Sequence, residues 1–444
     1  MVMEVVAVRY GEHEVGAVSF DTETGQGAFE YAPSFIGTGI ELSPIVMPLK
    51  PGIYSFPQFA FETYKGLPGL LADSLPDDFG NAVLNAWVAS QGKSVNDISP
   101  LQRLQYTGKR GMGALEFEPA TRLKSLGASQ QVDIPSLVSI AQEILDSRAA
   151  FELTLASPSQ IRQGQVDREA MLALLAVGTS AGGARPKAVL AFNADFTQVR
   201  SGQATLPAGF SHWLMKFDGV SEHNKDRETF GDPLGYGAME YVYALMASAC
   251  GIHMTPCRLL EEGNRRHFMT QRFDRKGNYK IHVQTLNGLA HVDYKKPGSY
   301  SYAELFGLAR QLGLNAAEAG QLLRRMVFNI VARNHDDHSK NIAFMLDTNH
   351  QWRLAPAYDL AYSYKPGSPW VNSHWMTLNG KRKHFVRDDF YTLEAISPLF
   401  SRRRINDVMD EITEQVSMWP KLARDHGVPV SLAEEITRNL RLSL

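Results

Sequence analysis

The chain has 444 residues, of which 44% are hydrophobic and 21% charged, and its formal net charge is −2. This length and composition describe a globular protein of about two to three domains and exclude a disordered or fibrous chain. The balanced charge provides no basic field that would favour direct binding to nucleic acid.

The two cysteines, Cys250 and Cys257, fit reduced thiols better than a disulfide framework. The N-terminus lacks the basic start of a secretory leader. No stretch approaches the ~18 apolar residues of a membrane span. We therefore expect a cytoplasmic protein without membrane contact.

The first unit is expected over residues 1–125, as an α+β subdomain. Short runs of β-branched and aromatic residues, separated by turn residues, predict strands at Val5–Tyr10, Glu14–Phe20 and Gln26–Tyr31. A helix is expected to begin at the acidic pair Asp77-Asp78. Another helix is predicted near residues 101–106, followed by a glycine-rich lead into a strand.

The second unit is expected over residues 126–275. It begins with amphipathic helical sequence and continues into a glycine-rich loop, residues 177–187, and a strand, Ala188–Phe192. Glycines in such a loop allow backbone N–H groups to approach phosphates. The Walker A pattern is absent, because Ala184-Arg185 stands where Lys-Ser/Thr is required. An ordinary hairpin turn is the alternative.

Two charged residues stand alone in apolar sequence downstream of this loop. Lys216 lies in a predicted strand, His212–Phe217, where it requires a buried partner or an anionic ligand. Glu240 lies on a predicted apolar helix, Ala238–Cys250. The alternatives are an edge-strand lysine and a helix-surface acid that both face solvent. A strand, His267–Arg275, then runs out into a linker.

The third unit, residues 276–444, is predicted to be mostly helical. Helices are expected at Tyr302–Leu312, Ala316–Ala332 with Asn315 as N-cap, Arg402–Ser417 and Ser431–Leu442. After the second of these comes a polar cluster, residues 334–341. A strand, Ile342–Leu346, and a second strand ending on Tyr358-Asp359 are expected to follow.

The polar cluster has the spacing D-x-x-x-x-N, from Asp336 to Asn341. In kinases this spacing sets a catalytic carboxylate beside a magnesium-binding amide, and a later aspartate binds the metal too. The glycine-rich loop, Lys216, Glu240, this spacing and Asp359 follow one another along the chain in the order found in kinases. This order predicts phosphoryl transfer with Asp336 as general base and with Asn341 and Asp359 as Mg²⁺ ligands. Lys216 would neutralise phosphate, and Glu240 would orient Lys216.

Three alternatives stay open at this point. Asp337 is a rival base, although it stands four rather than five residues before Asn341. A metal-dependent hydrolase could use the cluster His335, Asp336, Asp337 and His338, because all four are metal-ligand types. A nucleotide-binding, pseudokinase-like interaction module is the third.

The chain also resembles the HipA family of serine/threonine kinases, the toxin half of bacterial toxin–antitoxin pairs, over essentially its whole length. The motifs that carry the resemblance are Leu75–Asp77, Met112–Phe117, Ser180–Lys187, Gln271–Arg275, Asp336-x-His338-x-x-Asn341 and Tyr358-Asp359. The implied fold is α+β: a two-lobed kinase-like (HipA and phosphatidylinositol-kinase-like) core, with an N-terminal α+β subdomain and a mostly helical C-terminal lobe.

The resemblance implies ATP and Mg²⁺ as cofactors and adds site residues. His338 would belong to the catalytic motif, and Ser180 would be autophosphorylated. The implied nucleotide contacts are Gly182, Gly183, Ala184, Lys187, Lys216, Gln271 and Phe273. Arg185-Pro186 departs from the polar and acidic residues that can stand there in the family.

The resemblance also implies partners. They are a HipB-like helix-turn-helix antitoxin and a protein substrate, in known members an aminoacyl-tRNA synthetase. DNA would be contacted only indirectly, through the antitoxin.

Overall fold

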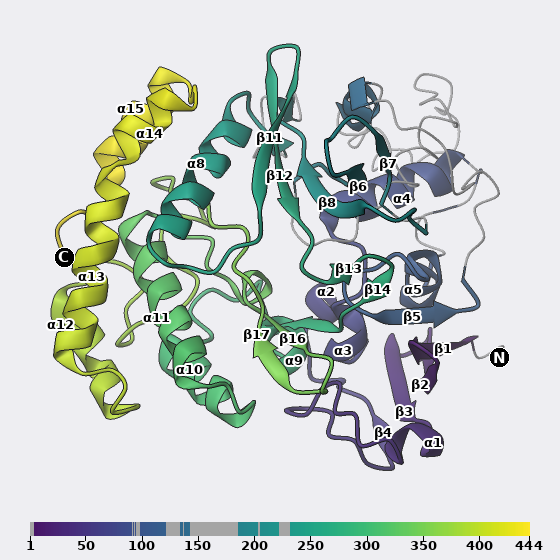
Figure 1. Cartoon of the computed structure of the whole chain (residues 1–444). Helices are drawn as coiled ribbons and strands as arrows, with labels where there is room; N and C mark the ends of the chain where they lie inside the picture. Colours follow the sequence, from purple (N-terminus) through teal and green to yellow (C-terminus); the bar gives the residue numbers. More distant parts are fainter. Residues whose placement is uncertain are drawn as a thin grey trace. The chain divides into compact units, whose positions relative to one another are not determined.

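The computed structural model describes residues 4–90, 92, 94, 98–120, 134–135, 137–142, 185–202, 205–221 and 231–444. The chain is a mixed α+β protein with two compact units (Figure 1). Unit 1 comprises Met1–Ile40, Leu49–Gly237 and Arg258–His282. Unit 2 comprises Glu41–Pro48, Ala238–Cys257 and Val283–Leu444.

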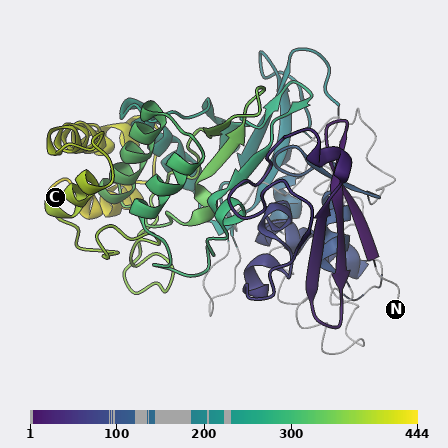
Figure 2. The same cartoon turned by 90° about the horizontal axis from the view of Figure 1, so that it is seen from below.

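Unit 1 begins with an antiparallel sheet in the order β4-β3-β2-β1-β5 (Figure 2). Its strands are β1 (Glu4–Tyr10), β2 (His13–Asp21), β3 (Gln26–Tyr31), β4 (Ile53–Tyr54) and β5 (Leu115–Glu118). Side chains alternate across β1, so Val6 and Val8 are fully buried. The three strands predicted from the sequence are confirmed.

Five helices accompany this sheet in the described part of the first 120 residues. They are α1 (Pro33–Ile36), α2 (Phe61–Tyr64), α3 (Gly69–Ala72), α4 (Asp78–Ser90) and α5 (Pro100–Thr107). A capping box between Ser99 and Gln102 begins α5, with Pro100 at its first position. The predicted helix starts at Asp78 and near residue 101 are confirmed.

The second sheet of unit 1 has the order β11-β12-β8-β6-β7. Its strands are β6 (Lys187–Asn193), β7 (Val199–Ser201), β8 (Phe210–Lys216), β11 (Cys257–Glu262) and β12 (Arg265–Gln271). One face packs on α4 through a buried cluster that includes Leu190, Trp213 and Met215 with Phe79 and Val83. Because side chains alternate along a strand, Leu214 and Lys216 belong to the opposite face.

Two small ribbons complete unit 1. They are β9 (Val220–Ser221) with β10 (Gly231–Asp232), and β13 (Arg275–Lys276) with β14 (Tyr279–Lys280).

Unit 2 contains a three-stranded sheet and the C-terminal helices. The sheet has the order β15 (Val283–Thr285), β16 (Ala343–Leu346), β17 (Trp352–Leu354). The helices are α8 (Tyr236–Ala249), which starts in unit 1, α9 (Leu286–Ala290), α10 (Tyr302–Gln311), α11 (Ala316–Val331), α12 (Arg387–Tyr391), α13 (Arg402–Ser417), α14 (Trp419–Asp425) and α15 (Val430–Asn439). Two 3₁₀ turns are η3 (Ser339–Asn341) and η4 (Thr392–Ala395). Asn315 caps α11 and forms a capping box with Glu318, as predicted.

Two sequence predictions for unit 2 are wrong in detail. The second strand of the hairpin, β17, ends at Leu354 and not on Tyr358-Asp359, because Pro356 cannot donate a ladder hydrogen bond. The last helix, α15, ends at Asn439, and the short helix α14 was not predicted.

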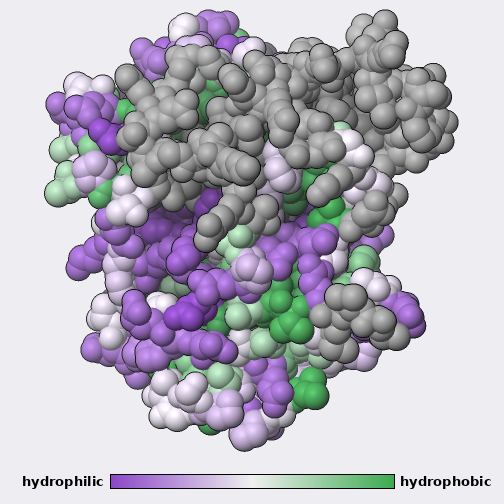
Figure 3. All heavy atoms as spheres, turned by 90° about the vertical axis from the view of Figure 1, so that its right-hand side faces the viewer, coloured by the Kyte–Doolittle hydropathy of each residue, from purple (hydrophilic) through white to green (hydrophobic). Residues whose placement is uncertain are grey.

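No helix in the described ranges is long and apolar enough to cross a membrane. Figure 3 shows one side of the molecule. The described residues on this side are mostly hydrophilic, and hydrophobic residues form a few areas among them.

Candidate active site

The candidate catalytic loop follows the end of α11. Arg333 adopts a left-handed conformation with φ of 59°, which turns the chain out of the helix. The loop closes on itself because Asn341 Nδ2 donates to the carbonyl oxygen of Asp336 at 2.8 Å. Since the amide donates through nitrogen, Oδ1 of Asn341 is the atom able to bind a cation.

The two neighbouring aspartates of this loop differ in exposure and in hydrogen bonding. Asp336 has a half-exposed side chain, 41% accessible, and its Oδ1 lies 3.5 Å from Nε2 of His338. Asp337 is 2% exposed and accepts from the Tyr302 hydroxyl at 2.7 Å and from the Trp375 amide at 2.7 Å. It also hydrogen-bonds His374 Nδ1 at 3.0 Å. A base must reach its substrate, so Asp336 fits that role and Asp337 fits a structural one.

The histidines of the loop do not converge on a metal. His335 is buried, its ring centroid lies 4.1 Å from that of His374, and Nδ1 lies 3.1 Å from the Val371 carbonyl. Burial, with the nearby His374 and Arg333, lowers the pKa of His335 to about 2. In the part of the chain with assigned positions, no group of three or more His, Cys, Asp or Glu side chains could hold a metal ion. The hydrolase alternative has no geometric support.

Asp359 also has an unusual backbone, with φ of 52° in a residue other than glycine. Such strain persists where surrounding contacts enforce it, and it often marks functional sites. The Tyr358 hydroxyl donates to the Lys340 carbonyl at 2.6 Å, and Asn334 Nδ2 lies 3.5 Å from the Asp359 carbonyl. The segment that carries Asp359 is therefore attached to the loop that carries Asp336 and Asn341.

Lys216 lies at the end of β8, in the middle of the five-stranded sheet, and is 5% exposed. The solvent-facing alternative is wrong. Its ammonium lies 5.8 Å from the ring centroid of Phe268, which is the residue opposite on β12. Lys187 is the residue opposite on β6, so two buried lysines are neighbours across the sheet.

Lys187 forms a buried ion pair with Asp77, with a distance of 3.0 Å between Nζ and Oδ2. Asp77 Oδ1 also accepts from the Gly80 amide at the start of α4. The Asp77 carboxylate neutralises the Lys187 ammonium within the fold. The expected phosphate contact of Lys187 stays a prediction.

The predicted hinge follows β12. Gln271 ends the strand, and both Gln271 and Phe273 are half-buried. Between them and β13 lies a buried knot: Asp274 accepts from Arg272 at 2.6 Å, from Arg275 at 2.7 Å and from the Gly113 amide at 2.8 Å. The two guanidinium groups hold the pKa of Asp274 far below its ordinary value despite burial. This knot fixes the hinge backbone to the glycine-rich segment before β5.

Glu240 lies on α8 and is 3% exposed, so the surface-acid alternative is wrong. The start of this helix is fixed by Asp218, two residues beyond Lys216. Asp218 Oδ1 accepts from the amides of Gly235 and Gly237 at 2.8 and 3.1 Å. A buried carboxylate thus accepts hydrogen bonds from amides at the helix N-terminus, which have no acceptor within the helix.

The phosphate-loop predictions fall on residues whose placement is not described. Ser180, Gly182, Gly183 and Ala184 lie outside the described residues. Of the predicted loop, Arg185, Pro186 and Lys187 are described.

Sequence reasoning did not predict the structural role of four buried carboxylates: Asp77, Asp218 and Asp274 in unit 1, and Asp337 in unit 2. A signal was present for Asp77, Asp218 and Asp274, since each follows an apolar residue or a proline, where an unpaired carboxylate would be costly if buried. Their partners come from distant parts of the chain, so the signal could not have identified them.

The fold is that of a two-lobed, kinase-like α+β protein. It is similar to a chain of the solved complex of the Shewanella oneidensis MR-1 toxin–antitoxin system HipA, HipB and its operator DNA. The TM-score is 0.61 and the sequence identity 16%, across 98% of this chain and 95% of that chain. Two family models, the HipA N-terminal domain and the HipA-like C-terminal domain, match residues 6–118 and 179–419. The chain belongs to the HipA family.

Two curated proteins of Sinorhizobium fredii (strain NBRC 101917 / NGR234) are also similar. "Putative kinase Y4mE" is 25% identical over 188 residues, which are 39% of this chain and 44% of that protein. "Putative kinase Y4dM" is 25% identical over 260 residues, which are 56% of this chain and 61% of that protein. The chain thus spans about half the length of the curated relatives it matches.

Proposed function

We propose that this protein is an ATP- and Mg²⁺-dependent protein serine/threonine kinase of HipA type. The observation that carries the proposal is the contrast within the catalytic loop. Asp336 is accessible, and it lies in a loop that the Asn341 side-chain amide closes by a hydrogen bond. Asp337, in contrast, is buried and accepts several hydrogen bonds. Phosphoryl transfer requires one accessible carboxylate at this position to orient the substrate hydroxyl and accept its proton.

The metal ligands proposed are Asn341 Oδ1 and the Asp359 carboxylate. Both are hard oxygen donors, which suit Mg²⁺, and two protein ligands suffice because phosphate oxygens and water complete its coordination. When bound, Mg²⁺ would neutralise charge that develops on the transferring phosphoryl group. The strained backbone of Asp359 would hold its carboxylate in one orientation.

We also propose roles for the remaining candidate residues. Lys216 neutralises nucleotide phosphate, Glu240 orients Lys216, and His338 holds Asp336. The backbones of Gln271 and Phe273 bind adenine, supported by the Asp274 knot that fixes them. Gly182, Gly183, Ala184 and Lys187 contact phosphate.

The test is transfer of labelled phosphate from ATP by the full chain and by two matched variants. Asp336→Asn should abolish transfer, because an amide cannot accept the proton. Asp388→Asn, the same change at an exposed position on α12, should transfer at the wild-type rate. Undiminished transfer by Asp336→Asn would refute the assignment. Nucleotide binding without transfer by the wild type would favour a pseudokinase instead.

The biological setting is proposed from the family. Ser180 is proposed as an autophosphorylation site, and the protein as a cytoplasmic toxin whose substrate is a translation-related protein such as an aminoacyl-tRNA synthetase. A HipB-like helix-turn-helix antitoxin would bind it, and DNA would be contacted only indirectly, through that antitoxin; the similar Shewanella oneidensis chain comes from a complex of HipA, HipB and operator DNA. Mass spectrometry after incubation with ATP should find phosphate on Ser180. Phosphate confined to other residues would exclude the autophosphorylation.

A further inference from the structure

Two helices of unit 2 end next to each other at the entrance to the candidate catalytic loop, and each end is capped by the chain that leaves the other. The last carbonyls of an α-helix have no partner within the helix. The carbonyl of Val331, which ends α11, accepts from the amide of Arg441 at 2.9 Å. The carbonyl of Asn439, which ends α15, accepts from Nε of Arg333 at 2.6 Å. The start of the catalytic loop and the segment after α15 are therefore bound to each other.

Arg333 is the residue through which these contacts act on the loop. Its φ of 59° is unfavourable for a residue other than glycine, and such a conformation persists where surrounding contacts enforce it. Its guanidinium carbon also lies 4.6 Å from the ring centroid of Tyr364. Its carbonyl accepts from the Ser363 amide at 3.0 Å, and the Ser363 carbonyl accepts from the His335 amide at 3.3 Å. Side chain and backbone together thus fix the direction in which the chain leaves α11 toward Asp336.

The end of α15 is itself held by side chains. Asn439 Nδ2 donates to the Tyr362 hydroxyl at 2.8 Å, and that hydroxyl donates to Glu435 Oε1 at 3.2 Å. The guanidinium of Arg441 donates to the Phe385 carbonyl at 2.6 Å. Tyr362 is buried, and breaking hydrogen bonds at a buried group is costly. The Asn439 carbonyl is therefore presented to the loop in a fixed position.

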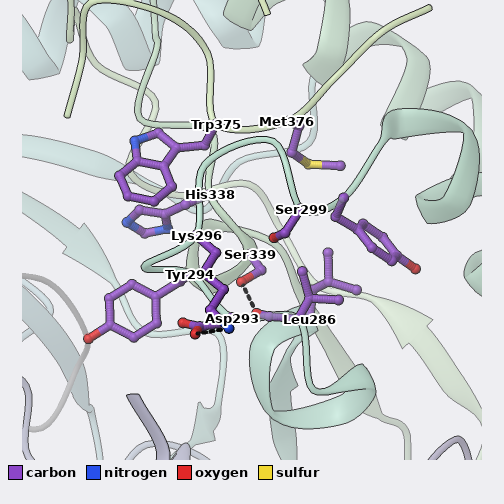
Figure 4. A pocket seen from close by; sticks show the side chains of 11 residues that line it. Leu286, Asp293, Tyr294, Lys296, Ser299, His338, Ser339, Trp375 and Met376 are labelled. Carbon is purple, nitrogen blue, oxygen red and sulfur yellow. Dashed lines mark hydrogen bonds and ion pairs between the residues drawn. The ribbon is translucent and has the colours of Figure 1, made fainter. Parts of the chain in front are cut away.

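The other end of the loop is anchored separately. His338 packs edge to face on Trp375, with ring centroids 5.8 Å apart, and Ser339 Oγ donates to the Val292 carbonyl at 2.5 Å. Figure 4 shows His338, Ser339 and Trp375 around a small pocket beside the loop. Asp336 lies between this anchor and the end of α11. Within the described residues its carboxylate has one side-chain contact, at 3.5 Å from His338 Nε2, so its position depends on how the loop backbone is held at both ends.

We propose that Arg333 is a positioning residue for Asp336, and that residues 439–441, after α15, form the clamp that holds Arg333. The clamp fixes the loop backbone before the substrate binds, so the carboxylate needs little reorganisation when it accepts the hydroxyl proton. The inference rests on the proposed function, because it names what positions the base of that reaction. Contacts that only stabilised the two helices would not change the rate of the folded enzyme.

The test measures transfer of labelled phosphate from ATP by the full chain with matched arginine substitutions. Arg333→Ala and Arg333→Gly both remove the guanidinium contacts, and glycine also adopts the φ of 59° without strain. We expect kcat to fall about ten- to hundredfold in both, with KM for ATP unchanged, because Asp336 acts on the substrate hydroxyl and not on the nucleotide. Arg333→Lys, which keeps a cation beside Tyr364, should recover part of the loss. Arg438→Ala, the same change at an exposed residue of α15, should transfer at the wild-type rate.

Amide hydrogen exchange over residues 334–341 provides a second readout that needs no transfer. Exchange there should be about tenfold faster in Arg333→Gly than in the wild type, and unchanged in Arg438→Ala. The proposal is overturned if Arg333→Gly keeps the wild-type kcat, if its loop exchanges at the wild-type rate, or if its loss of rate only matches the fraction of unfolded chain. A wild-type chain that transfers no phosphate would refute the proposed function alone, and the exchange rates would then decide whether Arg333 holds the loop.

Discussion

Replacing Asp337 should lower the stability of the fold, whereas replacing Asp336 should abolish phosphate transfer and leave stability nearly unchanged. Asp337→Ala would leave three well-formed donors without an acceptor: the Tyr302 hydroxyl, His374 and the Trp375 amide. A buried unsatisfied group costs about 1–3 kcal/mol, and partial relaxation would reduce the sum. We expect a loss of about 3–5 kcal/mol in the free energy of unfolding, the range typical of a broken buried charge network.

Asp337→Asn should cost about 1–2 kcal/mol, because its remaining oxygen can still accept from the Trp375 and Met376 amides. Asp336→Asn should change stability by less than about 0.5 kcal/mol, since its side chain is half exposed and has one long contact. Urea unfolding at pH 7 measures all three variants, and labelled ATP measures transfer. Only Asp336→Asn should lose transfer completely. A stability loss below about 1 kcal/mol in Asp337→Ala would refute the structural role.

Three further predictions concern other residues of the site. Asp359→Gly should preserve or slightly raise stability, because glycine adopts the φ of 52° without strain, yet it should abolish Mg²⁺-dependent transfer; retained transfer would exclude Asp359 as a ligand. His335 has its pKa lowered to about 2 in the fold, so between pH 6.5 and 2 the unfolded chain binds a proton that the folded chain does not, and stability falls as the pH falls. His335→Phe should therefore reduce the slope of unfolding free energy against pH, between pH 6 and 4.5, by about 1.4 kcal/mol per pH unit; an unchanged slope in urea titrations would contradict a neutral buried His335. Lys187→Met should cost about 3–5 kcal/mol by leaving Asp77 uncompensated, and adding Asp77→Asn should restore part of it; a coupling energy near zero in this double-mutant cycle would show that the pair is unimportant.

The sequence predicted local structure well wherever a periodic pattern was bounded by turn residues. The strands β1 to β3 and the helices α11 and α13 follow alternation or helical spacing that depends on neighbours a few residues away. The end of β17 was misplaced because the apolar sequence continues past Leu354, while Pro356 and the left-handed Asp359 redirect the chain.

The candidate base and the candidate metal-binding amide could be selected from the sequence because D-x-x-x-x-N is a local spacing, and their roles stay predictions. The distinction between Asp336 and Asp337 could be argued only from that spacing. Its physical cause lies in Tyr302 and in residues 374–376, which approach from other segments. The ion pair of Asp77 with Lys187 joins α4 to β6 in the same non-local way. Pairings of this kind are decided by tertiary packing, which a local pattern does not encode.

Several buried polar groups beside the candidate catalytic loop form one hydrogen-bonded network, and Asp337, the neighbour of the proposed base, belongs to it. Asp337 accepts from the Tyr302 hydroxyl, which in turn accepts from Asn329 Nδ2 at 3.2 Å. Asn329 Oδ1 accepts from Asn334 Nδ2 at 2.9 Å, and the same nitrogen lies 3.5 Å from the carbonyl of Asp359.

The network therefore runs from the neighbour of the proposed base to the backbone of the proposed metal ligand. Groups that stabilise a transition state are most effective when their positions are fixed before the reaction. A buried hydrogen-bonded network provides rigidity, and low dielectric makes breaking its hydrogen bonds costly. Arg333 and Asp359, two of the residues with a left-handed backbone, lie next to this network: Arg333 precedes Asn334, and the Asp359 carbonyl lies 3.5 Å from Asn334 Nδ2. The backbone positions of Asp336 and Asp359 are thus supported by buried residues that have no proposed role in binding or catalysis.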